Sequence, residues 1–366
     1  MPFLFLNSYC QLTPITSNTK ISVLTVGSAD ESHSLYGHTA LRINDATTDF
    51  DFIYNYGMFD FSTENFVLKF VKGDMQYFAA AYPYIDFEYS YRVENRSIYE
   101  QVLNLSLEEK QILFEKLNSS LRSDDKFYTY KFIDRNCTTK VVDILNEVLQ
   151  NKPIQKKNID SKTYRDVLYP YAKNHFYQEL GINIIFGKKV DEQATAIFLP
   201  FDFYENLKTT TYRNKPLVIE AKTVLKATQI KPNFSFIDSF YSLIVVLLFV
   251  LFINKKSLTI IYFGIIGLLG LFFITVGFYS FHEELYWNYN VFLFNPLCLV
   301  LIYFLIKKNI KWVKIMTTVC LTFLVIYLVY MFSKVHLLIV LPIAITNGIL
   351  LLKIILKKDN LLSSVK

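Results

Sequence analysis

The sequence predicts an α+β domain followed by an all-α transmembrane bundle of five helices. In the first 236 residues, short β-branched and aromatic runs precede helical patterns, which is typical of α+β domains. From about Phe236 onward, runs of Leu, Ile, Val and Phe alternate with short gaps that contain lysine. Residues 237–366 hold 11 Lys, no Arg and 4 acidic residues, whereas the preceding part is nearly neutral. The basic excess is therefore a membrane-topology signal, and nothing supports binding to nucleic acid.

The apolar runs are long enough, or nearly so, to cross about 30 Å of hydrocarbon. They cover residues 236–253, 258–280, 291–306, 313–332 and 335–356. Lysines gather in the gaps after the first, third and fifth runs, so these gaps are expected to be cytoplasmic. An odd number of spans then places the N-terminal domain, and the loop His282–Asn290, on the periplasmic or extracytoplasmic side.

These patterns divide the chain into five parts. We expect a truncated signal or N-terminal tail at 1–20, an extracytoplasmic catalytic domain at 21–215, a linker at 216–235, the membrane domain at 236–356 and a cytoplasmic tail at 357–366. The four cysteines form no disulfide framework, because Cys10 lies in the tail and Cys298 and Cys320 lie in apolar spans. Cys137 is alone in the polar domain.

Within the polar domain, the patterns predict strands at 21–27, 38–43, 51–57, 75–82 and 128–133. A helix is expected between Ser62 and Gly73. Ser106 and Glu109 form a capping-box signature before a second helix. A third helix is expected from Thr138 to Leu149, and residues 161–210 are expected to be mostly helical.

Cys137 is the candidate nucleophile. Asn136 is a plausible N-cap, which places the sulfur in the first turn of the third helix. The helix dipole and the free N–H groups there favour thiolate and could hold an oxyanion. Arg135 and Lys140 add positive potential. The alternative is a cysteine with no role in an ordinary buried helix.

His38 is the candidate base. Strand alternation places His38, Ala40 and Arg42 on one face, and a strand histidine opposite a helix-N-terminal cysteine is how papain-like enzymes generate a nucleophile. Asn55 is the candidate to orient the imidazole, with Asp60 and Tyr56 as rivals. Alternatively, His38 is structural and Asn55 only opens the turn at Gly57.

Several runs along the chain resemble one family. They are YGHTALRI, YNYGMFDF, FVLKFVKGDMQY, NCTTKVVDIL, FGKKVDEQATAIFLPFDF and HEELYWNYNVFLFNPL. The first five look like the extracytoplasmic domain of the bacterial lipoprotein N-acyltransferase family called Lnb, and the last is similar to that family's membrane portion. The resemblance covers nearly the whole chain.

The resemblance implies a permuted papain-like fold, as in NlpC and lecithin:retinol acyltransferase proteins, with the histidine strand before the cysteine helix. It also implies Cys137 as nucleophile and His38 as base, and it adds no cofactor or metal. Asn136 and Arg42 are expected to support the oxyanion or the local structure. A second catalytic histidine cannot be placed, because His33 lies in a probable loop.

The implied activity is acyl transfer at the cytoplasmic (inner) membrane. The acyl donor would be a membrane phospholipid, and the acceptor would be the α-amino group of a diacylglyceryl lipoprotein. The candidate substrate-binding residues are His282, Glu283, Glu284, Asn288, Asn290 and Tyr56. Alternatively, the loop His282–Asn290 binds no substrate and is an ordinary interfacial aromatic belt with acidic caps.

Three other functions stay open at this stage. A membrane-tethered cysteine peptidase or amidase would act on cell-wall peptides, although one anchor helix would suffice for it. A thiol phospholipase would differ only in releasing the acyl chain to water. A ligand-binding domain that signals through the bundle would tolerate loss of Cys137 and His38.

Overall fold

A computed structural model describes residues 15–31, 33–157, 161–172, 175–228, 234–253 and 255–356. The predicted cytoplasmic tail and most of the predicted N-terminal tail, including Cys10, lie outside these residues. The chain divides into two compact units, which are described separately. The first, here called the sheet unit, comprises Met1–Phe66, Met75–Asn158 and Thr195–Gln229, and the membrane unit comprises Val67–Asp74, Ile159–Ala194 and Ile230–Lys366.

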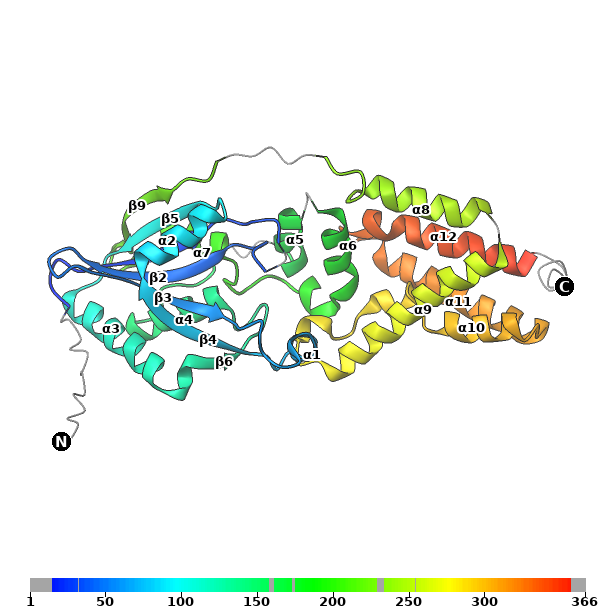
Figure 1. The fold of residues 1–366 in the computed structure, drawn as a ribbon, viewed down its shortest axis with the longest axis horizontal. Coiled ribbons are helices and arrows are strands. Elements are labelled where there is room, and N and C mark those ends of the chain that lie inside the picture. The colour runs from blue at the N-terminus through cyan, green and yellow to red at the C-terminus, as the bar shows by residue number, and fades with distance from the viewer. Residues whose placement is uncertain are drawn as a thin grey trace, which may run out of the picture. The chain divides into compact units, whose positions relative to one another are not determined.

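A seven-stranded antiparallel sheet forms the middle of the sheet unit (Figure 1). Its order is β6-β4-β3-β2-β1-β5-β9. The strands are β1 (Lys20–Val26), β2 (His38–Asp45), β3 (Phe50–Met58), β4 (Gln76–Pro83), β5 (Ile98–Leu103), β6 (Phe127–Thr129) and β9 (Val218–Leu225). A separate short hairpin joins β7 (Thr211–Tyr212) to β8 (Lys215–Pro216).

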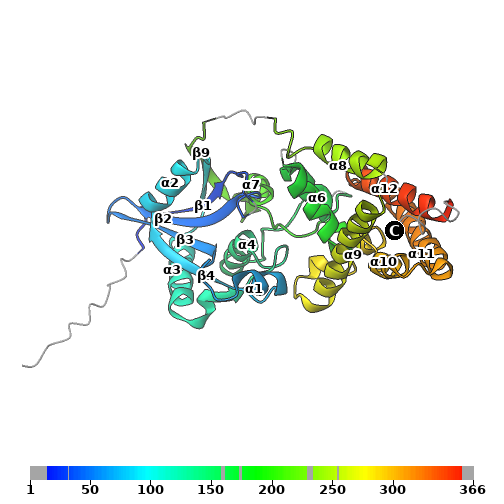
Figure 2. The same cartoon turned by 45° about the vertical axis from the view of Figure 1, so that its right-hand side comes forward.

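Helices cover both faces of this sheet, as Figure 2 shows. The helices of this unit are α2 (Tyr84–Val93), α3 (Leu107–Arg122), the short η1 (Asp124–Lys126), α4 (Cys137–Val148) and α7 (Pro200–Thr209). Residues of α3, α4 and α7 share one apolar core with Val23 and Leu41 of the sheet. Phe87 of α2 packs in a second core with Leu24 on the opposite face. The alternation of neighbouring strand residues between the two cores produces these layers.

The membrane unit contains most of the remaining helices. They are α1 (Phe66–Lys72), whose first residue belongs to the sheet unit, α5 (Tyr164–Leu168), η2 (Tyr169–Ala172), α6 (Phe176–Ile185), η3 (Lys188–Asp191), α8 (Phe240–Ile253), α9 (Lys256–Tyr279), η4 (Glu283–Leu285), η5 (Tyr289–Phe292), α10 (Leu297–Ile306), α11 (Ile310–Met331) and α12 (Leu337–Leu356). Within the described residues, four helical segments are long and apolar enough to cross a membrane, and α8 is a shorter apolar helix. The third segment, Glu283–Ile306, begins with short 3-10 turns, so its polar first half is less regular than a plain span.

The structure differs from the sequence-based expectations in three places. Residues 216–235 were predicted as a linker, but Val218–Leu225 forms edge strand β9 and pairs with β5. The strand predicted at 128–133 is limited to Phe127–Thr129. Residues 159–194 were assigned to the catalytic domain but cluster with the membrane helices. Edge strand β9 is mostly exposed, so its sequence lacks the apolar signal of a central strand.

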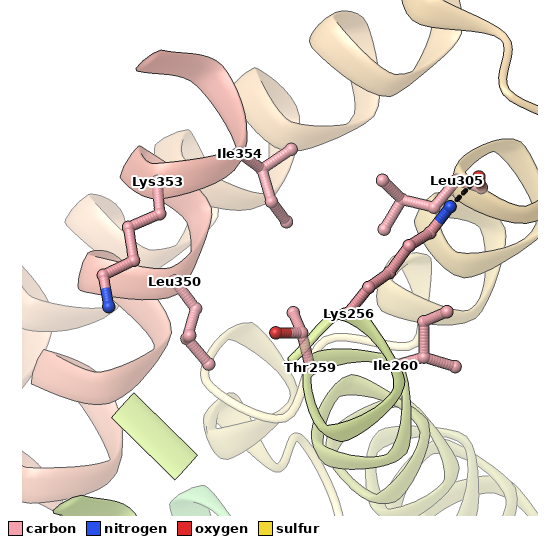
Figure 3. A pocket seen from close by; sticks show the side chains of 7 residues that line it. All are labelled: Lys256, Thr259, Ile260, Leu305, Leu350, Lys353 and Ile354. Carbon is pink, nitrogen blue, oxygen red and sulfur yellow. Dashed lines mark hydrogen bonds between the residues drawn. The ribbon is translucent and has the colours of Figure 1, made fainter. Parts of the chain in front are cut away.

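A crevice lies between the start of α9 and the C-terminal ends of α10 and α12 (Figure 3). It is lined by Lys256, Thr259, Ile260, Leu305, Leu350, Lys353 and Ile354. The Nζ of Lys256 donates to the carbonyl of Leu305 at 3.3 Å, and that of Lys353 donates to the carbonyl of Leu251 at 2.9 Å. The lysines thus satisfy carbonyls near the C-termini of α8 and α10, where cations are favoured. The lining contains no Cys, His or carboxylate, so this crevice is not a candidate active site.

Candidate active site

Cys137 is the first residue of α4, and Asn136 fixes the start of that helix. The Asn136 Oδ1 accepts from the N–H groups of Thr138 at 2.9 Å and Thr139 at 3.0 Å. Its Nδ2 donates to the carbonyls of Phe132 at 2.7 Å and Phe198 at 2.9 Å. The buried amide therefore uses both of its ends to hold the preceding loop and the first helical turn. This contact network sets the position from which the sulfur projects.

His38 opens β2 directly after a tight turn at Gly37. Gly37 has φ +83°, and a Cβ there would lie 2.5 Å from the carbonyl oxygen of Val26, so only glycine fits. The His38 Nε2 lies 2.5 Å from the Oδ1 of Asn55 on β3. The Asn55 Nδ2 in turn donates to the hydroxyl of Tyr82 at 2.8 Å. Tyr82 thus orients the amide so that its oxygen accepts the proton of Nε2, which leaves Nδ1 for the thiol.

Cys137 and His38 interact electrostatically, and each changes the pKa of the other. Burial raises the pKa of the Cys137 thiol, but the His38 charge and hydrogen bond, the Thr39 N–H and the Thr138 hydroxyl outweigh it and lower the pKa. Burial lowers the pKa of His38, but the Cys137 thiolate and the Asn55 hydrogen bond outweigh it and raise the pKa. The pair therefore favours thiolate and imidazolium, the form that attacks carbonyl carbon.

Gly57 adjoins the sulfur without a side chain of its own. Gly57 has φ +88° and lies where the β3–β4 register shifts between Asn55 and Met58. A Cβ at Gly57 would lie 3.4 Å from Cys137 Cβ and 3.9 Å from both His38 Cε1 and the Tyr128 hydroxyl. That hydroxyl is buried and forms no hydrogen bond with any side chain among the described residues. Burial, with the Cys137 charge, raises the pKa of Tyr128, so the phenol keeps its proton and can donate it.

Two protein-family models match this chain. The model of the Lnb N-terminal periplasmic domain matches residues 9–169, and that of the Lnb transmembrane domain matches residues 226–359. The chain belongs to the Lnb family. It is therefore a multi-pass membrane protein with a periplasmic domain, in a family of membrane enzymes that modify lipoproteins. Neither the curated proteins nor the solved structures gave a match.

The other predicted residues of the Lnb periplasmic domain lie in different surroundings. Arg42 pairs with Asp51 at 2.6 Å and Glu100 at 3.3 Å, and its guanidinium lies over the ring of Tyr84. Arg42 thus supports the sheet, because its guanidinium is engaged by Asp51, Glu100 and the Tyr84 ring. Asn136 supports the helix start, because its amide is engaged there.

The rivals of Asn55 are placed elsewhere by the structure. Tyr56 is 2% exposed and packs in the core of the α4 face, so it is not on an open substrate surface. Asp60 accepts from the N–H and hydroxyl of Ser62, which closes a turn. His33 pairs with Glu31 at 3.6 Å.

The predicted loop residues belong to the Lnb membrane unit, where their polar groups hold the loop in place. The Nε2 of His282 donates to the Phe70 carbonyl, Glu283 pairs with Lys189, and Glu284 is buried. The Asn288 Nδ2 donates to the carbonyls of Ile184 and Ile185. Asn290 accepts from the Tyr327 hydroxyl at 2.8 Å. These contacts show a structural use for each side chain, and a substrate role stays a prediction.

Sequence patterns alone did not single out Tyr82, Tyr91 and Tyr128. The Tyr91 ring stacks on His38 at 6.5 Å between centroids. Tyrosine is frequent in this chain, and these three lie on three different elements, so no spacing distinguishes them. Among the described residues, no group of three His, Cys, Asp or Glu side chains could hold a metal ion.

Proposed function

We propose that this protein is a lipoprotein N-acyltransferase of the cytoplasmic membrane. It would move an acyl chain from a membrane phospholipid, through a thioester on Cys137, to the α-amino group of a diacylglyceryl-cysteine lipoprotein. The main support is the Cys137–His38–Asn55 arrangement within an Lnb periplasmic domain that is joined to a transmembrane domain. Such a chain combines an activated thiol with access to lipid substrates.

The first half-reaction forms the thioester. The Cys137 thiolate attacks an ester carbonyl of the phospholipid and makes a C–S bond, while the carbonyl electrons move to oxygen. Asn136 occupies the N–H groups of Thr138 and Thr139, which leaves the N–H of Cys137 and the Tyr128 hydroxyl to stabilise that oxyanion. When the C–O bond breaks, the His38 imidazolium gives its proton to the departing alkoxide. The products are acyl-Cys137, lysophospholipid and neutral His38.

The second half-reaction transfers the chain to nitrogen. The lipoprotein amine attacks the thioester carbonyl and forms a C–N bond. His38 accepts the proton that the amine loses, and the Cys137 thiolate leaves when the C–S bond breaks. A thioester reacts with amines more readily than an oxygen ester does, which explains a cysteine rather than a serine in an enzyme that makes amides. His38 then carries the proton needed for the next acylation.

Intact mass spectrometry of the full-length protein in phospholipid nanodiscs tests this proposal. We expect a hydroxylamine-sensitive fatty-acyl adduct on the wild type and none on Cys137→Ala. The matched control Cys298→Ala changes a buried thiol of the membrane bundle and should keep the adduct. An unmodified wild-type protein with intact phospholipid would contradict acyl transfer.

Acceptor substrates distinguish the proposal from its alternatives. Adding a diacylglyceryl-cysteine lipopeptide should discharge the adduct and yield an N-acylated product. Release of the chain only as free fatty acid would instead indicate a thiol phospholipase. Cleavage of cell-wall peptides, with phospholipid untouched, would indicate a peptidase or amidase.

A further inference from the structure

The short helix α1 exposes an apolar surface. None of its residues is buried, and Val67 is 68% and Phe70 47% exposed. At 100° per residue, Phe66, Val67, Phe70 and Val71 share one side of the helix, and Phe66 at its start packs against the core of the sheet. Leu68 lies with Lys69 and Lys72 on the other side. An exposed apolar side opposite a basic side is typical of helices that lie in a membrane interface.

The segment Val67–Asp74, here called the interfacial segment, belongs to the membrane unit. The Phe281 N–H donates to the Lys72 carbonyl at 2.7 Å, and the Nε2 of His282 donates to the Phe70 carbonyl at 3.0 Å. Gly73, at φ +73°, lets the backbone approach closely, because a Cβ there would lie 2.9 Å from the His282 ring. The segment is therefore bound to the residues that directly follow α9.

These contacts set the depth of the interfacial segment in the membrane. The periplasmic domain precedes α8, so α8 enters the membrane from the periplasmic side and α9 returns to it. The exposed aromatic residues Phe278 (90%) and Tyr279 end α9, and exposed Phe281 follows it, which is the pattern expected of an interfacial belt. Since His282 and Phe281 hold the interfacial segment, that segment lies at the level of the periplasmic lipid headgroups.

We propose that the interfacial segment is a lipid-binding element that inserts its apolar side into the periplasmic leaflet. Val67 is at the middle of that side. Lys69 on the other side can reach lipid phosphates, while Lys72 pairs with Asp74. An amphipathic helix inserts its apolar side to the headgroup–acyl boundary, where the glycerol esters lie.

A consequence that rests on the proposed function follows from chain connectivity. The interfacial segment lies between β3, which carries Asn55, and β4, which carries Tyr82. Lipid contact would therefore be made by the connection between the two strands that orient His38. Bilayer phospholipid should then acylate Cys137 faster when the segment can insert.

Fluorescence quenching by brominated phosphatidylcholine in nanodiscs tests the lipid contact. Val67→Trp is placed in the full chain with Trp287→Phe and Trp312→Phe, and we expect several-fold stronger quenching than at Lys69→Trp in the same background. Phe278→Trp serves as the positive control at the end of α9. Quenching of Phe278→Trp without quenching of Val67→Trp, or equal quenching at Val67→Trp and Lys69→Trp, would overturn the proposal.

A kinetic measurement tests the link to catalysis. In the native-tryptophan protein, Val67→Asp should slow Cys137 acylation by bilayer phospholipid about tenfold and leave acylation by a soluble short-chain ester unchanged. An unchanged bilayer rate would refute the link even where the quenching supports lipid contact. Failure of the wild type to form any acyl adduct would refute the proposed function alone, because the quenching requires no catalysis.

Discussion

At the scale of single residues, the central feature is mutual stabilisation of two charges. The Cys137 pKa is lowered and the His38 pKa is raised, after burial has been outweighed in both cases. The thiolate is therefore present below the ordinary thiol pKa of about 8.5 and is lost as pH falls through the lowered value. His38 carries its proton to a higher pH than a free imidazole does. Between these two pKa values the ion pair predominates.

The first prediction concerns the pH profile of Cys137 alkylation. Iodoacetamide should label the wild-type thiol with a midpoint below the ordinary value of about pH 8.5, and His38→Ala should move the midpoint upward because the main lowering charge is gone. Peptide mass spectrometry after timed labelling measures the rate at Cys137 separately from the other thiols. An unchanged midpoint in His38→Ala would show that the two side chains do not titrate together.

The second prediction concerns the Tyr128 hydroxyl. Tyr128→Phe should lower the acylation rate by about 10²–10³, the usual effect of removing one oxyanion donor. Alkylation of Cys137 should be unchanged, because that reaction forms no oxyanion. Tyr77→Phe is the matched control, since Tyr77 is another buried tyrosine and its ring stacks on Tyr130. Equal acylation by Tyr128→Phe and the wild type would remove Tyr128 from the proposed mechanism.

At the scale of elements, strong local signals predicted the structure well. The capping box of Ser106 and Glu109 and the N-cap at Asn136 are both present, because each depends on residues at most three positions apart. The proximity of Cys137, His38 and Asn55 follows once α4 and the β2–β3 pair are assigned. Tyr82 and Tyr128 could not be predicted, since their roles depend on pairings of β4 with β3 and β6. Edge strand β9 was missed because its residues are mostly exposed.

The third prediction compares two helix caps. Asn136→Ala should lower the free energy of unfolding by about 1–3 kcal/mol, since it removes a cap and leaves buried groups without partners. It should also slow Cys137 alkylation at neutral pH, because the first turn of α4 loosens. Ser106→Ala removes the cap of α3 and should cost about 1 kcal/mol without affecting Cys137. Urea unfolding and timed alkylation measure the two effects, and equal alkylation rates for both variants would contradict the local role of Asn136.

At the scale of the whole molecule, the two units are interleaved along the chain. Hydropathy located the apolar helices, but it could not assign residues 159–194, which are polar and yet cluster with those helices. A buried ion pair supplies one physical reason. The Arg165 Nε donates to the Asp191 Oδ1 at 2.7 Å, and the Tyr289 hydroxyl donates to the other carboxylate oxygen at 2.8 Å. These bonds tie α5 and η3 to the loop before α10, and hydropathy does not report such contacts.

The final prediction is that this ion pair controls the stability of the membrane unit. Burial raises the Asp191 pKa, but Arg165, the Tyr289 hydroxyl and Lys334 outweigh it and lower the pKa. The carboxylate therefore stabilises the fold above its ordinary pKa of about 3.9, and that contribution is lost as pH falls through the lowered value. Asp191→Ala leaves the buried Arg165 charge without its partner, which typically costs about 3–5 kcal/mol. Lys189→Ala breaks an exposed pair with Glu283 and should cost at most about 1 kcal/mol.

Thermal unfolding of the full-length protein in detergent at neutral pH measures both changes. Asp191→Ala should unfold at a clearly lower temperature than Lys189→Ala, which should match the wild type. The double change Arg165→Met with Asp191→Leu should recover part of the loss, because no unpaired charge stays buried. If Asp191→Ala were as stable as Lys189→Ala, the ion pair would not be what holds residues 159–194 to the membrane helices. The assignment of that stretch to the membrane unit would then have to rest on apolar packing alone, such as that of Phe176 and Leu180 in the membrane core.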